Sequence, residues 1–311
     1  MVRQLGLLDG LLGGATSPVF ARHETFHPRF GWLKKGFDAV CKDRYVFSRE
    51  DAPIVLGVGK NMVRSIRYWC EAFKLTNKDQ PTPWGYQLLC RWDPYLEDVS
   101  SLWLLHWYLL KPPCTATAWW LTFNSFRPLE FTREDLIRMI KVSCDGLGRN
   151  IAESSILKDV SCLLRMYASQ AENSKSLLED TIDSPFVRLG LIKSGEDDKH
   201  FVFNVGFKAN LPNEVIVFAC LDYIALLMGD KKEGTISISR LLYEPNSPGM
   251  VFKLSEAALC KAIEDIAQSQ PTLHLSDNAG LIQLSFSTCP SMLSAAILES
   301  YYSQYFNGLS I

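Results

Sequence analysis

The side chains best suited to chemistry in this sequence of 311 residues gather near its start. Arg22, His23, Glu24 and Arg29 lie close together among aromatic neighbours. Guanidinium groups bind phosphates through forked hydrogen bonds, and a carboxylate can hold a magnesium ion or act as a base. The cluster is therefore typical of a phosphate-binding site. The alternative is a structural network in which Glu24 only neutralises Arg22 or Arg29.

The same stretch also matches the zinc-protease pattern H-E-x-x-H, from His23 to His27. That chemistry needs both histidines on one face of a continuous helix, one turn apart. Pro28 disfavours a helical conformation at His27, and Gly31 would break any helix that remained. The nine cysteines include no C-x-x-C pair, so they favour buried thiols in a reducing compartment over a metal cluster. We expect no zinc site.

A second polar stretch begins at Gly57 and Gly59. Gly59-Lys60 resembles the end of a nucleotide-binding loop, but that loop has a serine or threonine where this chain has Asn61, and its upstream glycine is missing. We therefore expect no bound nucleotide. The two glycines favour a turn that opens a helix, because residues 60–74 contain no proline or glycine.

The predicted helix over 60–74 has two unlike faces at 100° per residue. One face is apolar: Met62, Ile66, Trp69 and Phe73. The other is cationic: Lys60, Arg64, Arg67 and Lys74. An apolar stretch and a turn precede the helix, which is the pattern of a helix-turn-helix that presents its second helix to DNA. We predict as DNA-binding residues Lys60, Asn61, Arg64, Arg67, Lys34 and Lys35. The alternative is an amphipathic helix with ordinary surface cations.

Charge and tryptophan are unevenly distributed along the chain. Residues 20–75 hold 11 lysines and arginines against 6 aspartates and glutamates, although the whole chain has a net charge of −2. All eight tryptophans precede residue 121. The distribution indicates a basic, aromatic N-terminal module that contacts a polyanion with one face, whereas the chain as a whole is not cationic. No apolar stretch is long enough to cross a bilayer, so we expect no membrane contact and a cytoplasmic protein.

Helix, turn, helix and hairpin recur along the chain. Thr132 and Asp135 mark a helix start, and residues 200–205 alternate like a strand. Residues 272–275 and 280–286 predict a hairpin whose turn lies over residues 276–279. We expect a mainly α chain with small β-hairpins (α+β), built as tandem winged helix-turn-helix-like modules. The predicted divisions are an N-terminal tail over 1–19, a Trp-rich basic domain over 20–130, and further modules over 131–230 and 231–311.

Several long motifs in the first 130 residues resemble a known bacterial family. They are 22–26, 28–36, 56–64, 66–69, 93–98 and 102–107. These stretches look like a domain-of-unknown-function family encoded beside PAPS-reductase-like sulfurtransferases, the SspB family of the Ssp DNA phosphorothioation and defence system. The resemblance over the rest of the chain is one of architecture.

The resemblance implies an endonuclease that nicks one DNA strand so that sulfur can enter the backbone. The implied partners are DNA and the sulfurtransferase, ATPase and cysteine desulfurase of the same system. For such a reaction we assign Glu24 as the catalytic and metal-binding residue with magnesium or manganese, His23 as an acid/base group, and Arg22 and Arg29 as phosphate clamps. No familiar nuclease motif is present, which keeps two alternatives open: a non-catalytic winged-helix DNA reader, or an adaptor that uses the apolar helix over 215–228.

Overall fold

The computed structural model describes residues 18–146, 149–168, 184–195, 197 and 199–308. It divides into two compact units, the first ending at Asn204 and the second beginning at Val205. Both are helical with small antiparallel sheets, which confirms the α+β class. Most of the predicted tail over 1–19 lies outside the described residues. Among the described residues no helix combines the length and apolar character that a membrane span requires.

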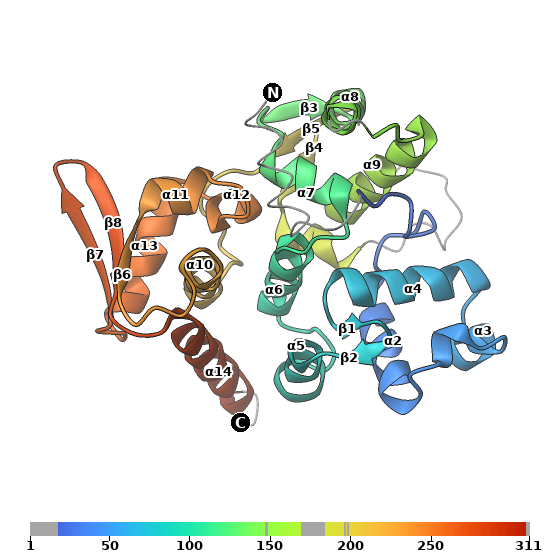
Figure 1. Cartoon of the computed structure of the whole chain (residues 1–311), viewed down its shortest axis with the longest axis horizontal. Helices are drawn as coiled ribbons and strands as arrows, with labels where there is room; N and C mark the ends of the chain where they lie inside the picture. The colour runs from blue at the N-terminus through green and yellow to red at the C-terminus, as the bar shows by residue number, and fades with distance from the viewer. Residues whose placement is uncertain (1–17, 147–148, 169–183, 196, 198, 309–311) are drawn as a thin grey trace. The chain divides into compact units, whose positions relative to one another are not determined.

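The first unit begins with a cluster of short helices around a tiny hairpin (Figure 1). The elements are α2 (Trp32–Lys42), a 3-10 turn (Val46–Ser48), α3 (Ala52–Leu56), α4 (Lys60–Ala72), β1 (Thr76–Asn77), β2 (Gln80–Pro81) and α5 (Pro83–Tyr86). A π-helical turn (Gln87–Trp92), α6 (Val99–Leu110) and α7 (Thr117–Asn124) follow. Helices α6 and α7 are buried on nearly every side, as expected from their continuous apolar sequence.

The rest of the first unit is a three-stranded antiparallel sheet with two helices. Its elements are β3 (Glu130–Thr132), α8 (Arg133–Asp145), α9 (Glu153–Tyr167), a 3-10 turn (Pro185–Leu189), β4 (Ile192–Ser194) and β5 (His200–Phe203). The strand order is β3-β5-β4. The predicted helix start is confirmed: the Thr132 side chain accepts a hydrogen bond from the Asp135 amide, and the Asp135 side chain accepts one from the Thr132 amide.

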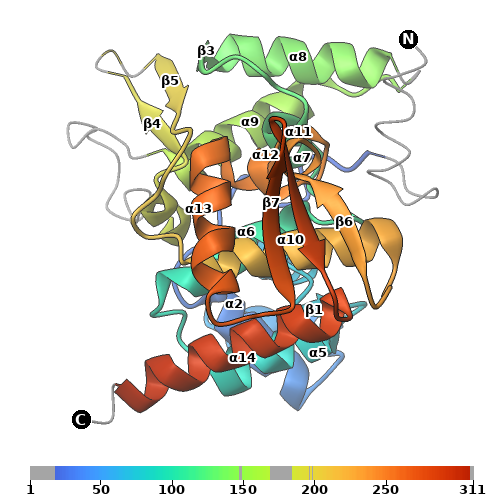
Figure 2. The same ribbon diagram turned by 90° about the vertical axis from the view of Figure 1, so that its left-hand side faces the viewer.

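The second unit likewise has helices between the first and second strands of a three-stranded sheet, with a further helix before the sheet and another after it. It comprises α10 (Asn213–Met228), β6 (Gly234–Ser237), α11 (Ile238–Tyr243), α12 (Pro248–Phe252), α13 (Glu256–Ala267), β7 (Leu273–Asn278), β8 (Leu281–Phe286) and α14 (Pro290–Gly308). The sheet order is β6-β8-β7, and α13 and α14 both pack on α10 (Figure 2). The predicted hairpin is present, but its turn is at Ala279-Gly280, because both residues have a positive φ and the strands run longer than the alternation indicated.

Helix α10 shows where the predicted modules and the compact units differ. The sequence grouped residues 213–228 with the module over 131–230, whereas the helix forms the centre of the second unit. Its side chains from Val215 to Leu221 are all buried. The division into three modules stays a prediction.

The tryptophans fill the core of the first unit. Trp69, Trp103, Trp119 and Trp120 are 0% exposed, and Trp69 meets Trp119 edge to face with ring centroids 5.4 Å apart. Beside this core α2 crosses α4 at Gly36, where an added Cβ would lie 2.5 Å from Ile66 Cγ2 and 2.7 Å from Cys70 Sγ. The missing side chain at residue 36 is therefore what lets α2 and α4 approach so closely.

Candidate functional site

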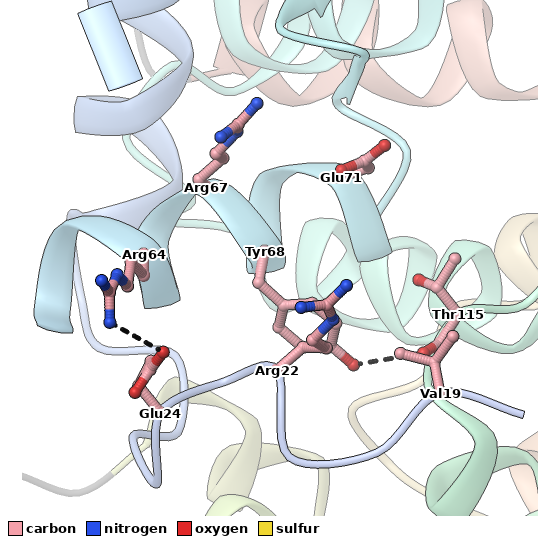
Figure 3. A pocket seen from close by; sticks show the side chains of 8 residues that line it. All are labelled: Val19, Arg22, Glu24, Arg64, Arg67, Tyr68, Glu71 and Thr115. Carbon is pink, nitrogen blue, oxygen red and sulfur yellow. Dashed lines mark hydrogen bonds and ion pairs between the residues drawn. The ribbon is translucent and has the colours of Figure 1, made fainter. Parts of the chain in front are cut away.

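A hollow of about 670 Å³ lies against the exposed side of α4 (Figure 3). It is lined by Val19, Arg22, Glu24, Arg64, Arg67, Tyr68, Glu71 and Thr115. The sequence placed Arg22 and Glu24 in a catalytic cluster and Arg64 and Arg67 on a DNA-binding helix. The fold brings these four residues together in one pocket.

Helix α4 presents its cations to solvent because its apolar residues are used in the core. Val63, Ile66, Trp69 and Cys70 are buried, whereas Lys60, Asn61, Arg64 and Arg67 are exposed. The turn before it matches the prediction. Gly57 ends α3 with a left-handed backbone at φ 61°, and Gly59 caps α4 in an extended conformation.

Two of the exposed arginines are partnered by carboxylates from outside the helix. Arg64 Nη1 lies 3.5 Å from Glu24 Oε1, a loose pair between half-exposed groups. Arg67 makes a two-pronged contact: Nε donates to Asp79 Oδ1 at 2.8 Å and Nη2 donates to Asp79 Oδ2 at 2.5 Å. Among the described residues Arg22, Lys60 and Asn61 are exposed and form no side-chain hydrogen bond or ion pair.

The stretch that matches H-E-x-x-H is a turn. Glu24 and Thr25 have left-handed backbones at φ 50° and 69°, and the Phe26 amide donates to the His23 carbonyl. His23 and His27 therefore do not project from one helical face, as zinc proteases require. The turn instead directs Glu24 toward α4.

His23 is the buried anchor of this turn. It is 0% exposed, and its Nε2 lies 2.9 Å from Asp159 Oδ1 on α9. The same carboxylate oxygen accepts a hydrogen bond from the Ala21 amide at 2.7 Å. Burial raises the pKa of Asp159, while the hydrogen bond with His23 opposes that shift. The His23 side chain, predicted to be an acid/base group, is thus buried and is not named among the residues that line the pocket.

Two more contacts fix the turn from both sides. Arg165 of α9 donates through Nη2 to the Thr25 carbonyl at 2.6 Å. Trp69 of α4 donates through Nε1 to the Phe26 carbonyl at 3.0 Å. Glu24 is therefore held between the two helices by backbone contacts, so that its own carboxylate remains one-third exposed toward the pocket.

The remaining predicted cations lie elsewhere on the first unit. The Arg29 guanidinium lies over the rings of Phe26 and Trp32, 5.7 and 5.3 Å from their centroids, and is not among the residues named as lining the pocket. Lys34 pairs with Asp38 at 2.7 Å, and Lys35 donates to the Leu56 carbonyl at the end of α3. Arg29, Lys34 and Lys35 thus make local contacts away from the pocket, and the roles predicted for them stay predictions.

Sequence reasoning missed the other groups of the site. Tyr68 lines the pocket and donates to the Thr115 carbonyl at 3.4 Å; burial, and next the negative charge of Asp159, raise its pKa well above the usual range. Asp79, Asp159 and Arg165 reach the site from distant parts of the sequence. A signal existed only for Asp79, since Asn77-Lys78-Asp79 directly after a helix is typical of a tight turn.

The pocket lining has more guanidinium groups than carboxylates, although Arg64 and Arg67 are each paired with a carboxylate. It carries three guanidinium groups against two carboxylates, and Glu71 lies at the far end from Glu24 (Figure 3). A magnesium ion takes six oxygen ligands, and in the described residues no three His, Cys, Asp or Glu side chains come together as a metal-binding group. The protein residues alone do not fit a magnesium site, and the ion assigned to Glu24 stays a prediction.

Comparisons with a family model and with solved structures identify the relatives of this chain. Residues 20–302 match the family described as a protein of unknown function, DUF4007. A search of the curated proteins matched none of them. Two crystal structures, SspB and magnesium ion-bound SspB, each share 37% sequence identity with this chain at a TM-score of 0.84, over 92% of this chain and 88% of theirs. The chain therefore belongs to the DUF4007 family, and its structure is like that of SspB.

Proposed function

We propose that this chain is the SspB-like component of a DNA phosphorothioation system. It binds duplex DNA along the exposed face of α4 and nicks one strand, with Glu24 as the catalytic base. The observation that carries the proposal is the shared pocket, in which the Glu24 turn and the cationic face of α4 line one cavity. A phosphate held by the helix would lie next to a carboxylate able to accept a proton.

The arrangement of α2, α3, α4 and the β1–β2 hairpin supports the DNA-binding part. We interpret it as a winged helix-turn-helix, with α4 as the recognition helix and the hairpin as a minimal wing. The sheet β3-β5-β4 with helices α8 and α9, and the sheet β6-β8-β7 with helices α11, α12 and α13, are interpreted as two further modules of this type. In the first of these modules Asp159 of α9 is hydrogen-bonded to His23 of the N-terminal turn, so α9 supports the pocket from beneath.

Three of the pocket residues have a defined task in the proposed cleavage. Arg22 and Arg64 hold the non-bridging oxygens of one phosphate and stabilise the extra negative charge that develops on it. Glu24 accepts a proton from the attacking water. The new bond joins the water oxygen to phosphorus, one phosphorus–oxygen bond of the backbone breaks, and the departing oxygen leaves with the electron pair.

The proposal places the chain in a cytoplasmic defence pathway with the sulfurtransferase, ATPase and cysteine desulfurase of the same system. The nick would give the sulfurtransferase access to a backbone phosphate. These partners rest on the family resemblance and the SspB-like structure.

The test is relaxation of supercoiled plasmid by the purified chain, with magnesium or manganese in the buffer. We expect open-circle product from the wild type and at least a hundredfold less from Glu24→Gln, which keeps the side-chain shape and removes the base. The matched control is Glu153→Gln, which removes an ion-paired carboxylate on α9 that is more exposed than Glu24. Nicking that persists in Glu24→Gln would remove the catalytic assignment.

A non-catalytic DNA reader is the second candidate, and the burial of His23 favours it. The predicted acid/base group is paired with Asp159 and 0% exposed, which leaves Glu24 as the proton acceptor in the cluster. If plasmid stays supercoiled with either metal while Arg64→Ala/Arg67→Ala abolishes DNA binding, the reader is the correct function. The control for the double variant is Arg138→Ala/Lys141→Ala on α8, whose side chains are also exposed and ion-paired.

A further inference from the structure

We infer that Arg67 reads a guanine in the DNA and that Asp79 sets the orientation in which it does so. The inference rests on the proposed DNA binding and adds to it the base that the recognition helix selects. It starts from the contrast between two neighbouring arginines. Arg64 has one loose contact at 3.5 Å, whereas Arg67 is held by two short parallel hydrogen bonds.

Asp79 can hold the Arg67 side chain in one orientation because the backbone of Asp79 lies in a tight turn. Lys78 and Asp79 are the two turn residues of the β1–β2 hairpin, both left-handed, at φ 50° and 57°. The base of the hairpin is tied to the end of α4, where Thr82 Oγ1 donates to the Lys74 carbonyl at 2.6 Å. The Asp79 side chain is only 16% exposed. The Asp79 carboxylate is therefore mostly buried and directed at Arg67 of α4.

The two hydrogen bonds leave a defined part of the guanidinium available. They use the Nε hydrogen and one Nη2 hydrogen, on one side of the group. The second Nη2 hydrogen and the Nη1 hydrogens form its end, and the Arg67 side chain is 46% exposed. Figure 3 shows Arg67 pointing away from Glu24. A pair of coplanar donors thus faces outward from the recognition helix in a fixed plane.

That pair of donors matches guanine better than it matches a phosphate. In the major groove guanine offers two acceptors, O6 and N7, to a two-pronged arginine. Asp79 already neutralises the charge of Arg67, so the attraction to a phosphate is weakened while hydrogen bonding to an uncharged base is retained. Arg22 and Lys60, exposed and without ion pairs in the described part of the chain, are the groups suited to phosphates.

The experiment selects duplexes from a random library with the full chain and sequences the bound fraction. We expect a guanine to be enriched in the wild type. Replacing that base by 7-deazaguanine, which lacks the N7 acceptor, is expected to weaken wild-type binding about tenfold. The same replacement is expected to leave binding by Arg67→Ala unchanged, since the contact is already absent. This comparison does not depend on altering the Asp79 turn.

The role of Asp79 is tested by Asp79→Asn, because asparagine tolerates the left-handed backbone. We expect the guanine preference to fall about tenfold, while binding to duplexes without that guanine is kept or strengthened, because Arg67 regains its uncompensated charge. A thermal melt equal to that of the wild type shows that the hairpin is intact.

Two results would overturn the inference without touching DNA binding itself. One is binding that is salt-dependent and lost in Arg64→Ala but selects no guanine. The other is a guanine preference that survives unchanged in Arg67→Ala. If the wild type binds no duplex at low salt, the proposed function fails, and the inference fails with it.

Discussion

At the scale of single residues, Glu24 and the DNA phosphate of the proposed function would compete for Arg64. In the free chain the Arg64 and Glu24 side chains lie 3.5 Å apart in the lining of the pocket. In the proposed function, a phosphate bound by Arg64 would take the place of Glu24 and leave the Glu24 carboxylate available as a base. DNA binding and the availability of the base would then be coupled.

We expect Glu24→Gln to bind DNA about threefold more tightly than the wild type while losing its nicking activity. The variant removes a negative charge from the phosphate path and frees Arg64 from an exposed ion pair, an effect of this modest size. Fluorescence anisotropy with a labelled duplex gives the affinity, and Glu153→Gln should show no change. Weaker binding by Glu24→Gln would contradict the competition.

Asp159 gives a pH prediction at the same scale, because burial raises its pKa above the ordinary aspartate value of 3.8. The folded chain then holds this proton to higher pH than the unfolded chain does. Its contribution to stability is complete below pH 3.8 and is lost as pH rises through the raised pKa. Asp159→Asn keeps an oxygen acceptor but cannot ionise, so its stability should not show this decrease with rising pH.

The measurement is the free energy of unfolding by urea at a series of pH values. The free energy of unfolding of the wild type minus that of Asp159→Asn should decrease as the pH rises above 3.8. Asp159→Ala should cost about 3 kcal/mol, because it leaves the His23 ring and the Ala21 amide without their buried acceptor. A difference between wild type and Asp159→Asn that is flat or increases with pH would show that burial does not dominate at this site.

At the scale of elements, the turn over 21–25 depends on α9. Arg165→Ala removes the donor to the Thr25 carbonyl. We expect nicking to fall about tenfold, because a misplaced base slows the reaction, while DNA affinity stays within about twofold, because α4 is untouched. Plasmid relaxation and anisotropy on one preparation measure both. Equal losses of affinity and nicking would instead indicate that Arg165 contacts DNA.

Local patterns predicted the elements better than they predicted the site. The Gly57–Gly59 turn, the α4 helix and the Thr132 cap were correct because each depends on neighbouring residues. The turn of the β7–β8 hairpin lies further along the chain than predicted, because Ala279 adopts a left-handed backbone that alanine rarely adopts.

The support of the site was not predictable from one sequence. His23 meets Asp159 across 136 residues of chain, and Arg165 reaches Thr25 across 140. Such pairs arise from how α9 packs against the N-terminal turn, and no periodicity in either segment encodes that packing. Residue type alone singled out four residues that the fold brings into one pocket, Arg22, Glu24, Arg64 and Arg67, and their functional roles stay predictions.

At the scale of the whole molecule, charge is divided between the two units. Residues up to 204 hold 26 lysines and arginines against 24 aspartates and glutamates, whereas residues 205–311 hold 6 against 10. The DNA binding proposed for this chain would therefore depend on a local surface and not on the net charge of −2.

We expect the logarithm of the DNA association constant to fall with the logarithm of salt concentration, with a slope of about −3. Each neutralised phosphate contributes about −0.9, and Arg22, Lys60 and Arg64 are the phosphate contacts proposed here. Lys60→Ala should make the slope shallower by about one, whereas Lys261→Ala on α13 should not change it. A slope near zero would exclude binding to the DNA backbone by this surface.

The crossing of α2 and α4 at Gly36 has a consequence for how this protein tolerates change. An added methyl group there would overlap Ile66 and Cys70, on the side of α4 opposite its cations. Gly36→Ala would therefore push α2 and α4 apart and change the position of Arg64 relative to Glu24, although residue 36 itself does not line the pocket. Under the proposed function, a loss of DNA binding could thus originate in the one residue of α2 that has no side chain.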